Sequence, residues 1–205
     1  MELAGKRVLL SGATGGLGRA IAEQLAAEGA TLVLSSRKEP DLEELRRSLP
    51  GGAERHEVVV ADQRSPRDLV RKRVHPLFDA GDIDGLVANA ALPGTGRLES
   101  FSEEEVGRAL RVNLEAPILM SRALAPALTE KGEGHMVFIA SLAGKVASPR
   151  ASIYAATKFG LRGFTLALRE DLRGTGASAS LIAPGFVRDA GMFADSGADA
   201  PAGIG

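Results

Sequence analysis

The sequence contains no cysteine and no tryptophan, and it has only 7 Phe and 1 Tyr. Without cysteine, the chain has no disulfides, no thiolate metal ligands and no cysteine nucleophile. The 3 histidines, His56, His75 and His135, lack the spacing of metal ligands, so the sequence predicts no metal site. Glycine is abundant instead, with 25 among 205 residues. It lets one backbone approach another, or a ligand, closely.

Positive and negative charges are balanced, since the sequence has 25 Lys and Arg residues and 26 Asp and Glu residues. This balance is not typical of proteins that bind nucleic acid or anionic membranes, and we expect neither partner. The longest uncharged run, between Arg173 and Arg188, is broken by glycine and proline and is too short to span a bilayer. The chain begins directly with a strand-like run and shows no signal-peptide pattern, which favours a cytoplasmic protein. The length suggests one domain.

Short, nearly continuous apolar runs alternate with helical patterns along the chain. Such runs are typical of strands that are covered on both faces of a parallel sheet. The expected strands are 6–11, 31–35, 56–61, 84–88, 135–140 and 178–183, and helices are expected near 17–25, 65–77, 102–128 and 152–172. Strict alternation predicts an α/β fold with one doubly wound parallel sheet, similar to the Rossmann fold.

The expected catalytic domain spans residues 1–187, and its last element ends near 183. Residues 188–205 are rich in Ala, Gly and Asp and predict a substrate lid or a disordered tail of the same domain. Two helix starts carry capping patterns: Ser65 before Pro66, and Ser102 with Glu105 three residues later.

A glycine-rich turn, Ser11 to Gly18, follows the first expected strand and opens the first helix. Glycines at 12, 16 and 18 permit a sharp turn and close approach of backbone N–H groups to a pyrophosphate at the helix N-terminus. The spacing is G-x-x-x-G-x-G, not the commoner dinucleotide spacing G-x-G-x-x-G. A glycine-rich turn that binds no ligand remains the alternative.

The second expected strand ends in Ser36-Arg37-Lys38, where a dinucleotide site for NAD(H) usually has a carboxylate. A carboxylate would repel a 2′-phosphate, whereas an arginine fork binds one. The sequence therefore favours NADP(H) over NAD(H). The alternative is that Arg37 and Lys38 are solvated loop charges.

The single tyrosine, Tyr154, precedes Lys158 by four residues in an expected helix, which places both on one face. We expect the ammonium group to lower the pKa of the phenol and to make it a general acid and base. Ser141 follows the strand at 135–140, at the sheet edge where ligands bind, and its hydroxyl is a candidate to hold a substrate oxygen.

Asn113 lies in the expected helix at 102–128, four residues before Pro117. Proline has no N–H, so the carbonyl of Asn113 loses its helical partner and is free to hold a water molecule. A capping or kink residue is the alternative interpretation of Asn113.

These motifs together resemble those of the short-chain dehydrogenase/reductase family. The glycine turn is similar to the family's T-G-x-x-x-G-x-G, with Ser11 in place of threonine. Asn113, Ser141, Tyr154 and Lys158 match its catalytic tetrad. Further matches are Asp62 to an adenine-contacting aspartate, Asn89 (in A-N-A-A) to the asparagine of N-N-A-G, and Pro184-Gly185 to the P-G before the nicotinamide.

The resemblance implies hydride transfer between NADP(H) and a carbonyl or secondary alcohol. Tyr154 would act as the general acid and base, Lys158 would tune it and hold the nicotinamide ribose, Ser141 would orient the substrate oxygen, and Asn113 would hold a relay water. The residues expected to bind the cofactor are Gly12, Thr14, Gly16, Leu17, Gly18, Arg37, Asp62, Asn89, Tyr154, Lys158, Pro184, Gly185 and Val187. The resemblance also implies a homodimer or homotetramer.

Three features depart from the family pattern. N-N-A-G is reduced to A-N-A-A, Asp189 stands where relatives often have a threonine, and the sequence stops about twenty residues after Pro184-Gly185. The sheet is thus expected to lack a last strand and helix, in a chain that is either naturally short or cut. A nucleotide-binding regulatory protein with little turnover is the alternative function.

Overall fold

The computed structural model describes residues 2–79 and 83–185. Its centre is a six-stranded, fully parallel sheet in the order β3-β2-β1-β4-β5-β6. The strands are β1 (Arg7–Ser11), β2 (Thr31–Ser36), β3 (Glu57–Val60), β4 (Gly85–Ala88), β5 (Gly134–Ile139) and β6 (Ala177–Ile182). The predicted single-domain α/β fold is confirmed, and each expected strand is present. Val187, Asp189 and the segment 188–205 lie outside the described residues.

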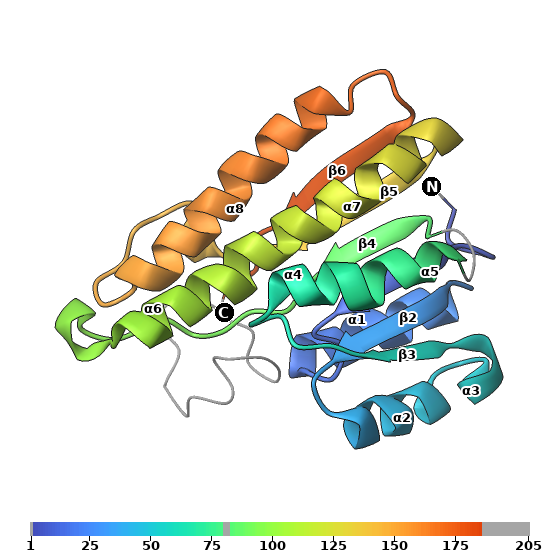
Figure 1. Ribbon diagram of the computed structural model, residues 1–205, viewed down its shortest axis with the longest axis horizontal. Helices are drawn as coiled ribbons and strands as arrows, with labels where there is room; N and C mark the ends of the chain where they lie inside the picture. Colours follow the sequence, from blue (N-terminus) through green and yellow to red (C-terminus); the bar gives the residue numbers. More distant parts are fainter. Residues whose placement is uncertain (1, 80–82, 186–205) are drawn as a thin grey trace.

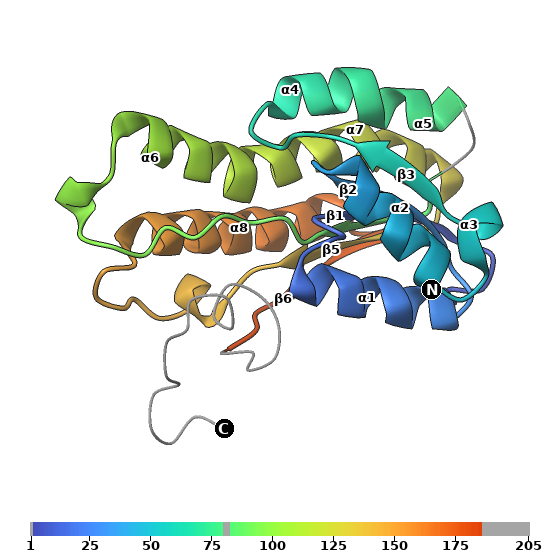
Figure 2. The same cartoon turned by 90° about the horizontal axis from the view of Figure 1, so that it is seen from below.

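Helices cover both faces of this sheet (Figures 1 and 2). On one face, α1 (Gly16–Ala27) and α2 (Glu39–Ser48) enclose a core that includes Leu10 and Leu34. On the other face, α4 (Pro66–Leu69), α5 (His75–Asp79), α7 (Ala116–Lys131) and α8 (Ser152–Asp171) enclose a second core around Phe138. Burial on both faces explains why the strands are apolar throughout.

The expected helix at 102–128 consists of three segments. They are α6 (Glu103–Leu110), the π-helical turn η3 (Arg111–Glu115) and α7. Pro117 at the start of α7 has no N–H to donate to Asn113, so the regular ladder is interrupted where the π turn occurs. The helix expected at 65–77 likewise contains a π turn, η1 (Val70–Val74), between α4 and α5.

The remaining short elements are α3 (Gly52–Arg55) and the 3₁₀ turns η2 (Leu98–Ser100) and η4 (Leu142–Gly144). The capping box at Ser102 is confirmed, since its hydroxyl accepts from the Glu105 N–H and the Glu105 carboxylate accepts from the Ser102 N–H. Ser65 occupies the N-cap position of α4, but its side chain bonds no helix N–H group.

The chain reverses its direction of sheet growth between β1 and β4, which are neighbours in the sheet. In sheets of this kind, ligands bind in the crevice beyond the carboxyl ends of the strands at this point. Ser11 ends β1 there, Asn89 follows β4, and Ser141 follows β5 shortly after. Over the described ranges, no helix is long and apolar enough to cross a membrane.

Candidate active site

The glycine turn between β1 and α1 is packed too tightly for side chains at two positions. Gly12 has φ +66°, and a Cβ there would lie 2.7 Å from the Cα of Ala90. A Cβ at Gly18 would overlap the carbonyl oxygen of Gly12 and lie 2.9 Å from that of Ala13. The turn therefore keeps its backbone exposed at the start of α1, which begins at Gly16 and Leu17. Such a turn presents N–H groups to a phosphate.

Asn89 joins the end of β4 to this turn. Its Nδ2 donates to the Gly12 carbonyl at 3.0 Å, and its backbone N–H donates to Ser11 Oγ at 3.1 Å. Thr14 makes a second tie, because its hydroxyl donates to Ser36 Oγ at the end of β2 at 3.0 Å. These bonds fix the turn against its two neighbouring strands.

The loops after β2 and β3 carry the charges expected near an adenosine moiety. Arg37 is exposed directly after β2. Asp62, after β3, is paired with Arg64, whose Nε and Nη2 lie 2.7 and 2.5 Å from Asp62 Oδ2. The Arg64 guanidinium holds the pKa of Asp62 below its usual range, and Arg37 contributes in the same direction. Arg64 is not among the residues expected from the sequence, because no spacing rule gives a signal for it.

Ser141, Tyr154 and Lys158 come together at the carboxyl end of β5. Ser141 caps η4, with its hydroxyl accepting from the Ala143 N–H, and it lies near enough to the Tyr154 phenol to act on the pKa of that phenol. Tyr154 and Lys158 lie one turn apart in α8, and the lysine Nζ is 5.5 Å from the centroid of the tyrosine ring. Gly144 lets η4 lie close to α8, because a Cβ at this position would lie only 2.7 Å from the Lys158 carbonyl oxygen.

The expected pKa shift of Tyr154 is wrong for the protein without ligands. Burial raises the pKa of the phenol, and the nearby Ser141 hydroxyl opposes this only in part. Lys158 does not lower it, because this residue is 2% exposed and its Nζ donates to the Ile139 carbonyl at 2.9 Å. Its own pKa falls to about 8 because burial disfavours the charged form.

Asn113 is buried in the π turn η3, and its side-chain amide is hydrogen-bonded on both its oxygen and its nitrogen. Its Oδ1 accepts from the Leu92 N–H at 2.7 Å, and its Nδ2 donates to the Leu92 carbonyl at 2.9 Å and to Thr157 Oγ1 at 3.3 Å. The amide thereby holds the segment after β4 against the catalytic helix α8. Thr157 was not predicted from the sequence.

Pro184 and Gly185, after β6, reach the same edge. The Pro184 carbonyl accepts from the Leu142 N–H at 2.9 Å, next to Ser141. The described residues thus bring every predicted site residue except Val187 to the carboxyl edge of the sheet. Within these ranges, no group of three or more His, Asp or Glu residues is arranged to hold a metal ion.

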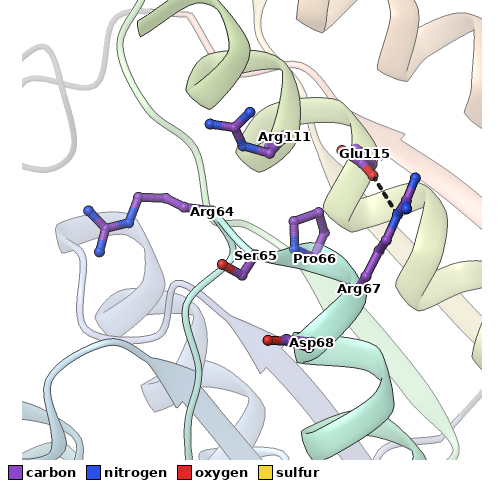
Figure 3. A pocket seen from close by; sticks show the side chains of 7 residues that line it. All are labelled: Arg64, Ser65, Pro66, Arg67, Asp68, Arg111 and Glu115. Atoms are coloured by element: carbon purple, nitrogen blue, oxygen red, sulfur yellow. Dashed lines mark ion pairs between the residues drawn. The ribbon is translucent and has the colours of Figure 1, made fainter. Parts of the chain in front are cut away.

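Two hollows lie near this edge but outside the tetrad. One, of about 330 Å³, is lined by Arg64, Ser65, Pro66, Arg67, Asp68, Arg111 and Glu115, and Figure 3 shows Arg67 pointing toward Glu115. The other, of about 250 Å³, is apolar and lies between α6 and the start of α8; it is lined by Leu98, Val106, Leu110, Ser152, Ile153 and Ala156.

The chain belongs to the short chain dehydrogenase family, whose pattern it matches over residues 6–201. It is 37% identical over 199 residues to the ketoacyl reductase HetN of Nostoc sp., covering 97% of this chain and 69% of that protein. It is 32% identical over 184 residues to mouse dehydrogenase/reductase SDR family member 7B, covering 88% of this chain and 57% of that protein. The chain thus spans about three fifths to two thirds of the length of these relatives.

Solved structures of the family show the same fold. A metagenomic short-chain oxidoreductase in complex with NADP has a TM-score of 0.83 and 34% identity, over 92% of this chain and 86% of that one. An NAD(P)-dependent gluconate 5-dehydrogenase from Beutenbergia cavernae with bound NADP is described as putative; it has a TM-score of 0.85 and 31% identity, over 90% and 74% of the two chains.

Proposed function

We propose that this chain is an oxidoreductase that transfers a hydride between NADP(H) and a carbonyl or secondary alcohol, with Tyr154 as the general acid and base. The observation that carries the proposal is the convergence of Ser141, Tyr154 and the buried Lys158 at the carboxyl end of β5. There Lys158 Nζ lies 5.5 Å from the centroid of the Tyr154 ring and donates to the Ile139 carbonyl. The glycine turn follows β1, the second strand over from β5 in the sheet. This arrangement combines a proton donor, an oxygen-binding hydroxyl and a cation at one site.

The residues present fit a dinucleotide. The turn at Gly12 and Gly18 has no room for side chains, so its backbone N–H groups and the N-terminus of α1 would hold the pyrophosphate. Arg37, with Ser36 beside it, would hold a 2′-phosphate, and Asp62 the adenine. Two solved relatives contain NADP, which supports NADP(H) as the cofactor. When bound, the nicotinamide supplies or accepts the hydride.

In the reductive direction, Tyr154 donates its phenolic proton to the substrate oxygen while Ser141 Oγ holds that oxygen. The raised pKa keeps the phenol protonated at neutral pH, as a proton donor requires. Lys158, buried beside the Tyr154 ring with its Nζ bound to the Ile139 carbonyl, would hold the nicotinamide ribose. Asn113, whose carbonyl faces a proline instead of an N–H donor, would hold the water that returns the proton.

The surface of α6 and α8 supports a homo-oligomer. Leu98, Leu110, Phe159 and Leu166 are 61%, 41%, 40% and 44% exposed. Gly163 on α8 has no atom within 4 Å of the place where a Cβ would stand, so a partner helix can approach closely there. We propose that these helices pair with their copies in a dimer or tetramer.

A substrate panel tests the function. NADPH oxidation is followed with aldehydes, ketones and 3-oxoacyl thioesters, the last because two relatives are named ketoacyl and 3-oxoacyl reductases. Tyr154→Phe should lower kcat by about 10²–10⁴-fold while NADPH affinity changes little. Near-normal turnover in Tyr154→Phe would refute the mechanism, and tight NADPH binding without turnover on any carbonyl would favour a regulatory nucleotide-binding protein.

A further inference from the structure

Thr157 directly precedes Lys158 in α8 and belongs to none of the sequence motifs. It forms a buried link between α8, which carries Tyr154, and the π turn η3, which carries Asn113. It is 0% exposed. Its hydroxyl donates to the Tyr154 carbonyl at 2.8 Å and accepts from Asn113 Nδ2 at 3.3 Å. One hydroxyl thereby connects the catalytic helix α8 to the π turn η3.

The direction of these bonds determines the orientation of the Asn113 amide. The Thr157 proton is used toward the Tyr154 carbonyl, so its oxygen faces Asn113 as an acceptor. The amide must then turn Nδ2 toward Thr157 and Oδ1 toward the Leu92 N–H. A flipped amide would place two acceptors against each other at Thr157 and two donors at Leu92. Thr157 therefore reinforces the amide orientation that the Leu92 N–H and carbonyl also require.

We infer that Thr157 is a positioning residue for hydride transfer, an inference that rests on the proposed function. It fixes Asn113, and through Asn113 the segment at Leu92, relative to the backbone that carries Tyr154. Small displacements of reacting groups are costly, since about 1 Å reduces rates by up to about 10²-fold. Without its hydroxyl, the protein retains the tetrad, but the distance between the phenol and the proton relay is no longer fixed.

The same helix offers a matched control. Thr165 also lies in α8, is 1% exposed, and donates its hydroxyl to the Leu161 carbonyl at 2.8 Å. It has nearly the same burial and the same kind of bond to its own helix as Thr157, but among the described residues its hydroxyl makes no hydrogen bond to the site. Thr157→Val and Thr165→Val thus remove equivalent hydroxyls, and only the first removes the link to Asn113.

The experiment compares Thr157→Val, Thr157→Ser and Thr165→Val in the full chain. For Thr157→Val we expect kcat to fall about 10-fold or more, KM for NADPH and substrate to change less than about twofold, and the pH profile of kcat to shift because the relay to Tyr154 is disturbed. Thr157→Ser should restore both kcat and the pH profile, and Thr165→Val should lower only the melting temperature, by about as much as Thr157→Val does.

Two other results overturn different claims. If the wild-type protein turns over but Thr157→Val keeps its kcat and pH profile, or Thr165→Val loses as much kcat, then Thr157 serves stability alone. If the wild-type protein reduces no carbonyl in the panel, the proposed function itself fails, and the role of Thr157 fails with it.

Discussion

Replacing Gly18 by alanine tests whether the glycine turn is built for close backbone contact. The added Cβ would overlap the Gly12 carbonyl oxygen and lie 2.9 Å from that of Ala13, while nonbonded heavy atoms prefer about 3.5 Å or more. The neighbours are backbone atoms, which have no flexible end that can move aside. The turn must therefore shift, and overpacking of this kind costs about 1–3 kcal/mol.

Gly15→Ala in the same turn is the matched control. A Cβ there would meet only the Gly12 carbonyl oxygen, at an ordinary 3.6 Å, and Gly15 has φ −72°, which alanine adopts without strain. Alanine reduces the conformational freedom of the unfolded chain, so the free energy of unfolding of this variant should equal that of the wild type or exceed it by about 0.4–1 kcal/mol.

Urea unfolding and NADPH titration by fluorescence measure both effects. We expect Gly18→Ala to lose stability and to bind NADPH at least about 10-fold more weakly, because the displaced N–H groups no longer converge on the phosphates. Gly15→Ala should match the wild type in binding. If both variants behave alike in both assays, close packing at Gly18 is not what forms the site.

Three further predictions concern the cofactor, pH and assembly. Arg37→Asp should weaken NADPH binding far more than NADH binding, because a carboxylate repels the 2′-phosphate; equal losses in parallel titrations would make Arg37 a solvated charge. Burial lowers the pKa of His56, which bonds the Leu32 N–H and the Pro50 carbonyl. The unfolded state then binds the proton more tightly, so His56 contributes its full stability above about pH 6.5 and loses it as pH falls from there toward the folded pKa. Urea midpoints at pH 7.5 and 5.5 should differ less in His56→Gln than in the wild type, and an unchanged difference would exclude His56 as a cause. Phe159→Glu, on the exposed face of α8, should reduce the oligomer to monomers in light scattering, whereas a wild-type monomer at micromolar concentration would contradict the interface.

The strands and the placement of the site were predictable because their causes are local. Apolar runs specify buried strands, and the i, i+4 spacing of Tyr154 and Lys158 brings both side chains to one helix face. The proline at 117 likewise indicated the break at Asn113 that the structure shows as a π turn. These features depend on residues close to one another in the chain.

What the sequence did not reveal depends on packing between distant segments. The pKa of Tyr154 rises because the folded chain buries the phenol, and Lys158 turns its ammonium toward Ile139, 19 residues away. The pairing of Asn113 with Leu92 and Thr157 joins three elements that no spacing rule relates. Arg64 and Asp62 are near neighbours, but only the loop geometry shows that they pair.

The order of the strands has a consequence for how the protein is made. β1 pairs with β2, which follows it closely in the sequence. It also pairs with β4, where Gly85 lies opposite Val8 of β1. Closing that long loop costs entropy before the pairing returns any energy, so we expect β1 to pair with β2 before it pairs with β4. The bond from Asn89 to Gly12 crosses the β1–β4 seam, and we therefore expect the glycine turn to be completed late in folding. If the turn binds a nucleotide as proposed, the bound nucleotide should favour molecules in which the two halves have joined and should protect the β1–β4 seam against opening.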